Sequence, residues 1–258
     1  MKISLILSTY NWVEALTLSL RSALDQSRLP DEILVADDGS RDETRQRVEA
    51  IARTAPVPVR HIWHEDNGFR LTVIRNRAMA AATGDYLIQI DGDIILHRRF
   101  IEDHARMAER GYYVIGSRVI LGEKLSAGLL SGAVKRFGLC NADLKNRLNG
   151  IRCPLLTSLF RTRKAHARGC NMAFWRDDVV AVNGYDERMT GWGYEDNEFA
   201  ARLSNSGIRQ HSLKFGGIGY HLYHPVRSQE SMNINFEIWQ ASLRNGTVRC
   251  EQGIDAYL

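Results

Sequence analysis

The stretch that decides the fold is YLIQIDGDIILHRRF, residues 86–100, in which a largely apolar run stops at two carboxylates. Asp91 and Asp93 follow that run, Gly92 separates them, and a second apolar run comes next. In parallel α/β sheets, ligands lie beyond the carboxyl ends of the strands. The stretch therefore predicts a buried strand that carries two acids to the ligand edge of a sheet. The structural alternative is an Asp-Gly turn without a ligand, since this pair is common in turns.

The sequence before this stretch alternates between predicted strands and helices. Strands are predicted over residues 2–10, 31–40 (where the strand runs into a turn), 59–66 and 85–91. Helices are predicted over residues 12–27, 41–55 and 72–84. Ser40 and Glu43 have the spacing of a capping box at the start of the second helix. The alternation indicates an α/β fold with a mainly parallel, Rossmann-like sheet and helices on both faces.

Polar side chains follow each of the four predicted strands. They are Thr9, Tyr10 and Asn11; Asp37 and Asp38; Glu65, Asp66 and Asn67; and Asp91 and Asp93. Because parallel strands end at the same edge of a sheet, we expect these four sets to lie along one edge. A chain that only needed turns would not require acids at three of the four places.

The second half of the chain has weaker periodicity. A helix is predicted over 100–111, a strand over 112–121 and a helix over 195–207. Residues 129–139 have the composition of an amphipathic segment within an otherwise irregular region. We expect one continuous domain in three parts, residues 1–117, 118–168 and 169–258.

Composition favours a soluble globular protein. The chain has 258 residues, of which 25% are charged, and no apolar run approaches the ~20 residues that cross a bilayer. Its first residues make a poor secretion signal, so we expect a cytoplasmic location. The four cysteines are scattered and form no CxxC pair, which predicts free thiols.

Positive charge gathers in the middle of the chain. Residues 118–168 contain eleven Lys or Arg and two acids, a net charge of +9, whereas the whole chain carries +4. Such a segment fits an anionic membrane surface, which would place the protein on the inner face of the cytoplasmic membrane, or a phosphorylated glycolipid. We assign this contact to residues 124–168, where Arg163 and Lys164 are among the cations. A solvated loop is the alternative. Nucleic acid is disfavoured because no aromatic residues interleave with the basic ones.

Four segments in fixed order resemble a known family. ILSTYNW, VADDGSRDET, NGFRLTVIRNRAMAAATGDYLIQIDGD and GWGYEDNEFAARL look like the family 2 glycosyltransferases, which have a GT-A fold. The last segment is similar to the catalytic motif of β-1,4-galactosyltransferases and bacterial chondroitin-type polymerases. The resemblance covers most of residues 1–110 and 168–225. Tyr194 departs from the galactosyltransferase pattern, which has glycine there, and Asn197 replaces an acid, so the acceptor stays open.

The resemblance implies a hexosyltransferase that uses a divalent metal to move a sugar from a UDP-sugar to a glycan or glycolipid. Surface polysaccharide or lipopolysaccharide biosynthesis is the implied setting. The first 117 residues would hold the nucleotide-sugar. Residues 169–258 would bind the acceptor and carry the catalytic groups. The residues that match donor contacts are Thr9, Tyr10, Asn11, Glu14, Asp37, Asp38, Arg75, Asp91 and Gly92.

The resemblance also implies a site for Mn²⁺ or Mg²⁺. Asp93 matches the direct metal ligand, and Asp91 matches a contact to ribose or metal. One of two late histidines would complete the site, His221 in preference to His224. A histidine bonded to a backbone carbonyl at a strand end is the structural alternative.

The catalytic groups implied by the match lie in the last segment. Asp196 matches the base that deprotonates an acceptor hydroxyl, and Glu195 would hold that acceptor. Trp192 would stack on a sugar ring, with Gly193 leaving room for close approach. A helix N-terminus lowers the pKa of a carboxyl group and burial raises it, so the sequence leaves the pKa of both acids open. An acidic cluster that only satisfies the helix dipole is the alternative.

Three other functions compete with inverting transfer. Retaining transfer is possible because retaining N-acetylgalactosaminyltransferases have a related segment. A nucleotidyltransferase would carry a glycine-rich loop after the first strand, but residues 8–16 contain no glycine. A non-catalytic sugar-binding module would not need Asp93 and Asp196 together.

Overall fold

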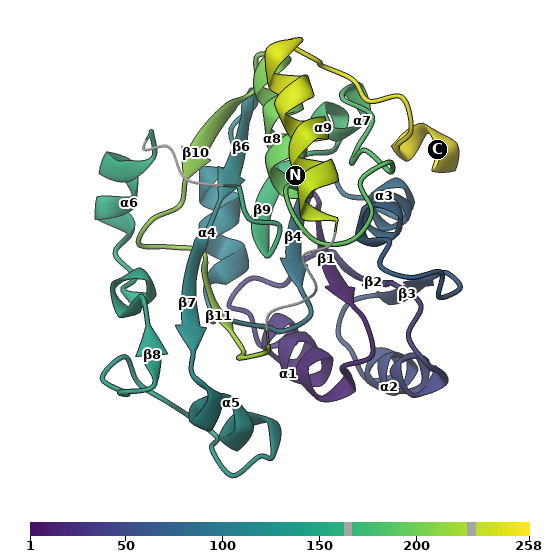
Figure 1. Cartoon of the computed structure of the whole chain (residues 1–258). Coiled ribbons are helices and arrows are strands. Elements are labelled where there is room, and N and C mark those ends of the chain that lie inside the picture. Colours follow the sequence, from purple (N-terminus) through teal and green to yellow (C-terminus); the bar gives the residue numbers. More distant parts are fainter. Residues whose placement is uncertain (163–166, 226–230) are drawn as a thin grey trace.

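A seven-stranded sheet forms the centre of the computed structural model, which describes residues 1–162, 167–225 and 231–258 (Figure 1). The strand order is β10-β6-β9-β4-β1-β2-β3. These strands are β1 (Ile3–Thr9), β2 (Glu32–Asp37), β3 (Val59–Trp63), β4 (Tyr86–Asp91), β6 (Tyr112–Ile115), β9 (Asn171–Trp175) and β10 (Arg209–Ser212). Strand β9 is antiparallel to its neighbours β4 and β6, and the other pairs of this sheet are parallel. The predicted mainly parallel α/β sheet is confirmed.

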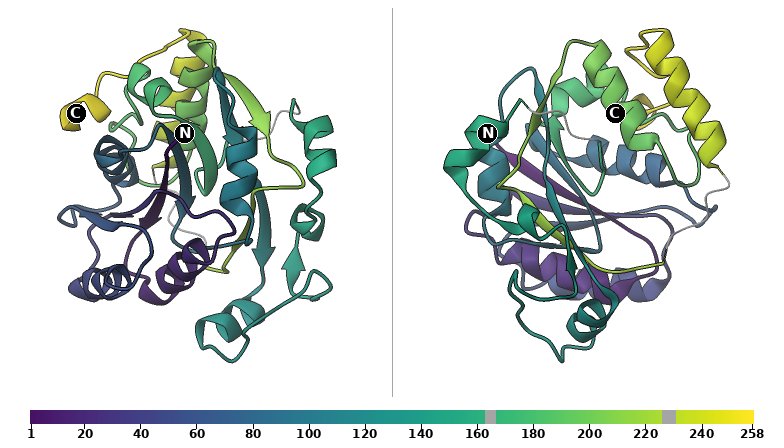
Figure 2. Two further views of the ribbon diagram at one scale, coloured as in Figure 1. Left: turned by 180° about the vertical axis from the view of Figure 1, so that it is seen from behind. Right: turned by 60° about the vertical axis from the view of Figure 1, so that its left-hand side comes forward.

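Helices cover both faces of this sheet, as Figures 1 and 2 show. Helices α1 (Val13–Leu24), α2 (Asp42–Ala52) and α4 (Phe100–Met107) pack on one face through a core that includes Leu16, Val48 and Phe100. Helices α3 (Leu71–Ala81), α7 (Arg176–Ala181) and α8 (Glu195–Asn205) pack on the other face, where Ile74 and Phe199 are fully buried. Helix α9 (Met232–Arg244) lies against α8.

A smaller second sheet stands beside the first, with the order β5-β11-β7-β8. Its strands are β5 (Ile94–Leu96), β7 (Ser117–Leu121), β8 (Leu144–Lys145) and β11 (Ile218–His221). It has a separate apolar core, in which Val119, Leu121 and Ile218 are buried against α5 (Glu123–Leu130). Helix α6 (Pro154–Phe160) and the short 3₁₀ helices η1 (Arg147–Gly150) and η2 (Ile254–Tyr257) complete the described elements.

The structure corrects two local predictions. The single strand predicted over 112–121 is wrong: β6 and β7 belong to different sheets, and the chain turns between them at Gly116, where a Cβ atom would collide with the side chain of Asn171. The capping box is also wrong. Ser40 Oγ instead accepts a hydrogen bond from Asn11 N at 2.7 Å, and α2 begins two residues later, at Asp42.

Two further sequence expectations concern the basic segment and the thiols. Residues 129–139 form only the end of α5 and a non-helical stretch, because α5 ends at Leu130 and Gly132 adopts a φ of 76°. Among the described residues, no helix combines the length and apolar character that a membrane crossing requires. All four cysteines are free, as predicted.

Candidate functional site

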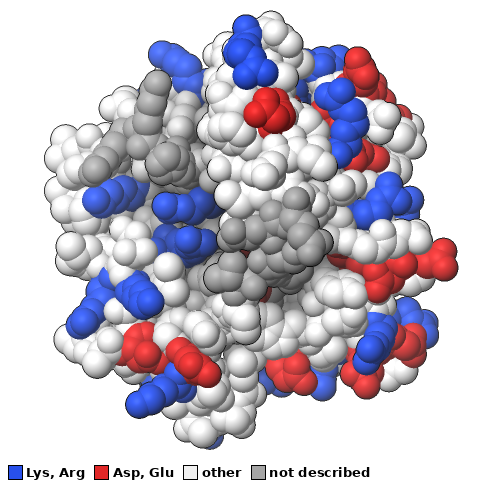
Figure 3. All heavy atoms as spheres, in the orientation of Figure 1, with Lys and Arg blue, Asp and Glu red and all other residues white. Residues whose placement is uncertain are grey.

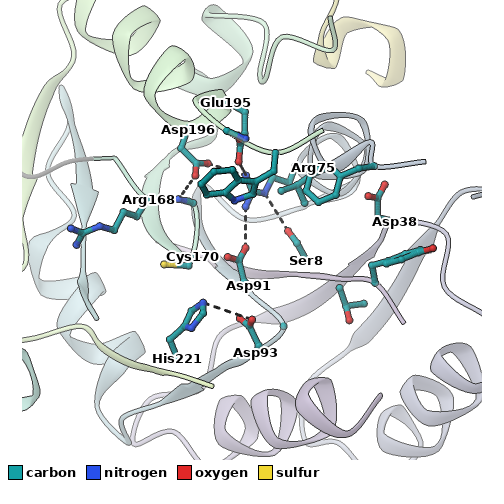
Figure 4. A pocket seen from close by; sticks show the side chains of 18 of the residues that line it. Ser8, Asp38, Arg75, Asp91, Asp93, Arg168, Cys170, Glu195, Asp196 and His221 are labelled. Carbon is teal, nitrogen blue, oxygen red and sulfur yellow. Dashed lines mark hydrogen bonds and ion pairs between the residues drawn. The ribbon is translucent and has the colours of Figure 1, made fainter. Parts of the chain in front are cut away.

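A pocket of about 490 Å³ opens at the carboxyl ends of β1 and β4 (Figure 4). It is lined by residues from distant parts of the chain, including Thr9, Tyr10, Asp38, Arg75, Asp91, Gly92, Asp93, Trp192, Gly193, Glu195, Asp196, His221 and His224. The predicted edge of the sheet and the late catalytic segment therefore meet in one cavity. They meet because β4 pairs with β1 on one side and β9 on the other, which carries the chain toward α8.

Arg75 lies at the centre of the charges in this pocket. Its side chain is fully buried, and it donates to Asp196 Oδ1 at 2.9 Å, Asp91 Oδ1 at 3.0 Å and Ser8 Oγ at 3.3 Å. Glu195 Oε1 lies 4.0 Å away. Burial opposes the charged form of Arg75, but Coulombic interactions with Tyr185, Asp196, Asp91 and Glu195 outweigh burial and raise its pKa above the usual value. Arg75 thus holds acids from β4 and α8 together.

Asp196 and Glu195 have different surroundings although they are adjacent. Asp196 Oδ1 accepts hydrogen bonds from Arg75 and from Tyr185 Oη, the latter at 3.0 Å, and its Oδ2 accepts one from Gly169 N at 2.6 Å. Glu195 is buried, and Gly193 N donates to its Oε2 at 3.0 Å. Burial, and after it the charge of Asp196, raises the pKa of Glu195 to about 7. For Glu195, burial therefore outweighs the helix N-terminus.

Three side chains form a candidate metal centre. Asp93, His221 and His224 each offer a ligand atom, and these atoms lie within 4.8 Å of one another. Asp93 Oδ2 is 3.4 Å from His224 Nε2 and 3.7 Å from His221 Nε2. Asp93 Oδ1 is buried and has no hydrogen-bond partner among the described residues. A buried carboxylate oxygen without a donor fits a divalent cation, as do two imidazoles beside it. Asp91 is instead held by Arg75 and is not part of this group.

Only some of the residues predicted to contact the nucleotide line the pocket. Thr9, Tyr10 and Asp38 line the pocket, and Asp38 is held by His64 Nε2 at 2.8 Å and by Arg70 N at 3.1 Å. The Asp37 side chain is fully buried, and it contacts His61 Nε2 and Ser40 N. It therefore stabilises the turn after β2.

Asn11 and Glu14 also stay outside the residues that line the pocket. Asn11 adopts a φ of 46°, and its side chain accepts a hydrogen bond from Arg41 N at 2.9 Å. Glu14 is exposed on the first turn of α1. Their predicted role at the base and ribose stays a prediction, and the contacts of Asn11 support a turn.

The loop before α8 explains one departure from the galactosyltransferase pattern. Tyr194 adopts a φ of 63°, in the left-handed region that favours glycine. Gly193 has a φ of 120°. Tyr194 stacks on Trp239 of α9, with ring centroids 5.2 Å apart and an angle of 12° between the planes. Trp192, two residues earlier, is exposed and lines the pocket.

Several residues that line the pocket belong to none of the predicted catalytic, metal-binding or nucleotide-binding sets. They are Ser8, Trp12, Phe69, Arg118, Arg168, Gly169 and Cys170. Tyr185 is also absent from the predicted site residues, although its hydroxyl donates a hydrogen bond to Asp196. Ser8 could have been found from its place at the end of β1. The others reach the site only through long-range pairing of strands and helices.

Comparison with protein families gives two matches. The model of glycosyl transferase family 2 matches residues 4–180. A second model, described as the N-terminal domain of galactosyltransferase, matches residues 153–225. The two matches together include the acids at the end of β4, the acids at the start of α8, and His221 and His224.

Curated relatives include the putative glycosyltransferase EpsE of Bacillus subtilis (strain 168), which is 31% identical over 225 residues. That match covers 83% of this chain and 77% of the relative. Chondroitin synthase of Escherichia coli is 24% identical over 254 residues, which cover 89% of this chain but 36% of that protein. The present chain thus spans little more than a third of the chondroitin synthase.

Solved structures with a similar fold include S. aureus TarS 1–349 in complex with UDP-GlcNAc, with a TM-score of 0.64 and 17% identity. The match covers 100% of this chain and 69% of that chain. The mannosyltransferase PcManGT from Pyrobaculum calidifontis, in complex with GDP-Man and Mn²⁺, matches with a TM-score of 0.62 and 18% identity over 94% of this chain and 64% of that one. The expected GT-A fold is confirmed.

The family assignment rests on extent as well as on motifs. The family 2 model spans well over half of the chain, and EpsE is more than 30% identical over most of both proteins. The fold and the order of the motifs agree with it. The chain belongs to glycosyl transferase family 2.

Proposed function

We propose that this chain is a metal-dependent, inverting glycosyltransferase that moves a hexose from a UDP-sugar to a glycan or glycolipid. The observation that carries the proposal is that one pocket holds both the Asp93, His221 and His224 group and the Asp196 carboxylate. A metal-assisted transfer needs a cation at the leaving diphosphate and a base at the acceptor. The relatives named chondroitin synthase support polysaccharide biosynthesis as the setting. Lipopolysaccharide biosynthesis is the alternative setting of this proposal.

The donor is proposed to lie between Asp38 and Asp93. His64 and Arg70 N fix the carboxylate of Asp38. In this proposal Asp38 would accept a hydrogen bond from a uracil ring. Tyr10 follows Thr9, whose carbonyl oxygen accepts a hydrogen bond from Asp38 N at 2.9 Å. Tyr10 lines the pocket and 37% of its surface is exposed, which leaves its ring available to a base. Similar folds that bind UDP or UDP-GlcNAc support a uridine nucleotide.

Asp93, His221 and His224 would hold the metal. Mn²⁺ suits a set of one carboxylate and two imidazoles better than Mg²⁺, which prefers oxygen ligands alone. A similar fold in complex with Mn²⁺ supports this choice. Bound there, the ion would neutralise the charge that develops on the departing diphosphate.

Asp196 is proposed to take the proton of the acceptor hydroxyl. Its Oδ1 is occupied by Arg75 and Tyr185, whereas its Oδ2 accepts, among the described residues, a hydrogen bond from Gly169 N alone. A lone pair of Oδ2 therefore remains for the acceptor proton. Glu195 would orient that acceptor, with Trp192 against a sugar ring. Attack opposite the leaving group converts an α-linked donor into a β-glycoside.

The test is transfer by an Asp196→Asn protein. We expect transfer to fall by about 10²–10⁴-fold, because asparagine cannot accept the proton. Screening UDP-Gal, UDP-Glc, UDP-GlcNAc and UDP-GalNAc for Mn²⁺-dependent hydrolysis identifies the donor first. Asp177→Asn, at an exposed acid on α7 outside the pocket, serves as the matched control and should keep activity. Near-wild-type transfer by Asp196→Asn would refute the base assignment.

Retaining transfer and non-catalytic binding are separated by simple measurements. The anomeric coupling constant of the product, read by NMR, reports inversion or retention. UDP binding that does not change when Mn²⁺ is added or removed would favour a sugar-binding module. Release of diphosphate from UTP in the presence of a sugar 1-phosphate, in place of UDP release from a UDP-sugar, would point to a nucleotidyltransferase.

A peripheral contact with an anionic membrane, on its cytoplasmic face, is proposed for residues 124–168. Leu148, Leu155 and Leu159 are 71%, 85% and 75% exposed. Figure 3 shows Lys and Arg side chains over the same part of the surface, where α6 and β8 lie in Figure 1. Arg163 and Lys164 of this segment lie outside the described residues. Exposed leucines beside cations are typical of a surface that inserts among anionic headgroups.

Binding to vesicles tests this contact. Wild-type protein should sediment with phosphatidylglycerol vesicles, less so at high salt, and a Leu155→Ser, Leu159→Ser protein should bind several-fold less. Binding that neither salt nor the double variant weakens would exclude this surface.

A further inference from the structure

Two arginines of the pocket have no part in the transfer described above. Arg118 lies on β7, and Arg168 directly precedes Gly169, whose backbone N–H contacts Asp196. Both line the pocket. Neither forms an ion pair with a carboxylate in residues 1–162, 167–225 or 231–258. Arg75, by contrast, is already neutralised by Asp91 and Asp196.

The two guanidinium groups are close enough to affect each other. Arg118 Nη1 lies 3.7 Å from Cys170 Sγ, two residues along the chain from Arg168. Burial, and after it the positive charge of Arg118, lowers the pKa of Arg168 below its usual value. Arginine stays protonated in proteins, so the pair keeps both charges. Two neighbouring cations that lack an anionic partner among the described residues form a site for an added anion.

The position of Arg118 and Arg168 in the pocket restricts which anionic group they can bind. In the view of Figure 4, the Arg168 side chain lies on one side of Asp91 and Asp93, and Asp38 lies on the other side. A nucleotide with its base at Asp38 and its diphosphate at Asp93 would direct its sugar away from Asp38. The arginine end therefore receives the donor sugar or the acceptor, and not the nucleoside.

We propose that Arg118 and Arg168 form an anion subsite for a carboxylate or phosphate group carried by one of the two sugars that the enzyme joins. The inference rests on the proposed function and names its substrate class. Planar guanidinium groups match both anions through paired hydrogen bonds. The donor sugar and the acceptor sugar are the two possible carriers of the charge, and the experiment has an arm for each.

The donor arm compares two nucleotide-sugars that differ only at C6. UDP-glucose and UDP-glucuronic acid are titrated into wild type, Arg118→Gln and Arg168→Gln by calorimetry with Mn²⁺ present. If the donor carries the charge, wild type should bind UDP-glucuronic acid roughly tenfold more tightly, and each variant should lose that preference. Arg47→Gln, an exposed arginine on α2 outside the pocket, is the matched control and should keep it.

The acceptor arm uses three aryl β-glucosides: the neutral sugar, its 6-carboxylate and its 6-phosphate. The donor is whichever UDP-sugar the enzyme hydrolyses with Mn²⁺. If the acceptor carries the charge, wild type should show a KM roughly tenfold lower for a charged acceptor, and each of the two variants should raise that KM toward the neutral value without changing the KM for the donor.

The outcomes separate the subsite from the proposed function. A charge preference in either arm that both variants abolish and Arg47→Gln retains supports the subsite and identifies the carrier. No preference in either arm overturns it, as does a preference that the variants leave unchanged. If the variants weaken binding of UDP alone to the same degree, the arginines contact the diphosphate and the subsite is again wrong. Failure of wild type to bind UDP with Mn²⁺ would instead overturn the proposed function, and the subsite with it.

Discussion

Arg75 is the residue on which the charge balance of the pocket depends. It is 1% exposed and contacts Asp91 and Asp196, so its removal would leave two acids without their cation. Breaking a buried ion pair by removing one partner costs about 3–5 kcal/mol. We expect Arg75→Met to lower the free energy of unfolding by about this amount, measured by urea denaturation.

A surface pair provides the comparison for Arg75. Arg45 lies 2.6 Å from Asp42, but its side chain is 56% exposed. Solvent screens such a pair, so Arg45→Met should leave the free energy of unfolding almost unchanged. Equal effects of the two substitutions would show that the buried network does not stabilise the fold.

Glu195 makes stability depend on pH. Its pKa of about 7 lies above the ordinary value of 4.5, so the folded protein keeps this proton to a higher pH than the unfolded chain does. The contribution of Glu195 to stability is therefore fully present below pH 4.5 and is lost as the pH rises through 7. Glu195→Gln cannot ionise and escapes this loss. Relative to wild type, the variant should gain about 1–3 kcal/mol between pH 5 and pH 8.

Urea denaturation of both proteins at pH 5 and pH 8 measures this gain. Glu65→Gln, at an exposed acid outside the pocket, should show the same difference from wild type at both pH values. A difference between Glu195→Gln and wild type that is independent of pH would mean that Glu195 ionises normally.

The packing of helix α9 depends on Tyr194, whose backbone conformation is strained. The left-handed backbone of Tyr194 costs about 1–2 kcal/mol for a residue other than glycine, and the stack on Trp239 offsets that cost. We expect Tyr194→Gly to destabilise wild type, because the ring contact with α9 is lost. In a Phe236→Ala, Trp239→Ala background the same change should stabilise, because both ring contacts are already lost and only the strain remains to be relieved.

Thermal unfolding of these variants measures this change of sign. In a double-mutant cycle, the coupling between Tyr194 and Trp239 should be about 0.5–1.5 kcal/mol. Phe236, which also contacts Tyr194, provides a second partner for the same cycle. Additive effects of Tyr194→Gly and Trp239→Ala would exclude the stack as the reason for tyrosine at this position.

The elements of the first half could be predicted because their signals are local. Alternation of strand and helix and the apolar spacing of residues 1–91 fix β1 to β4 and the helices between them. The second half could not be read in this way. Strand β9 enters the sheet antiparallel between β4 and β6, and residues 112–121 divide between two sheets. Both features depend on contacts with distant residues, which periodicity does not encode.

The residues of the candidate site also differ in how far the sequence predicts them. Asp38, Asp91 and Asp93 follow strands, and the sequence placed them at one edge. Their different roles depend on residues that are distant in the sequence. Asp91 forms an ion pair with Arg75, whereas Asp93 faces two histidines. Asp37, one residue before Asp38, points into the fold because side chains alternate along a strand.

At the scale of the whole molecule, the candidate metal centre joins the two sheets. Asp93 follows β4 of the large sheet, and His221 ends β11 of the small one. An ion held between them would link the two sheets directly, and unfolding would have to release it. Ligand that binds only the folded state stabilises it by about 2.7 kcal/mol at a hundred times its dissociation constant. We expect Mn²⁺ and UDP together to stabilise wild type to about this extent.

Thermal unfolding with and without Mn²⁺ and UDP measures this stabilisation in four variants. Asp93→Asn should lose most of it, whereas Asp85→Asn, at an acid just before β4 on the opposite edge of the sheet, should retain it. His221→Ala and His224→Ala then distinguish two arrangements. Loss in both means that the ion uses both imidazoles, and loss in one names the single histidine ligand. If Asp93→Asn is stabilised as much as wild type, the ion lies elsewhere and does not link the two sheets.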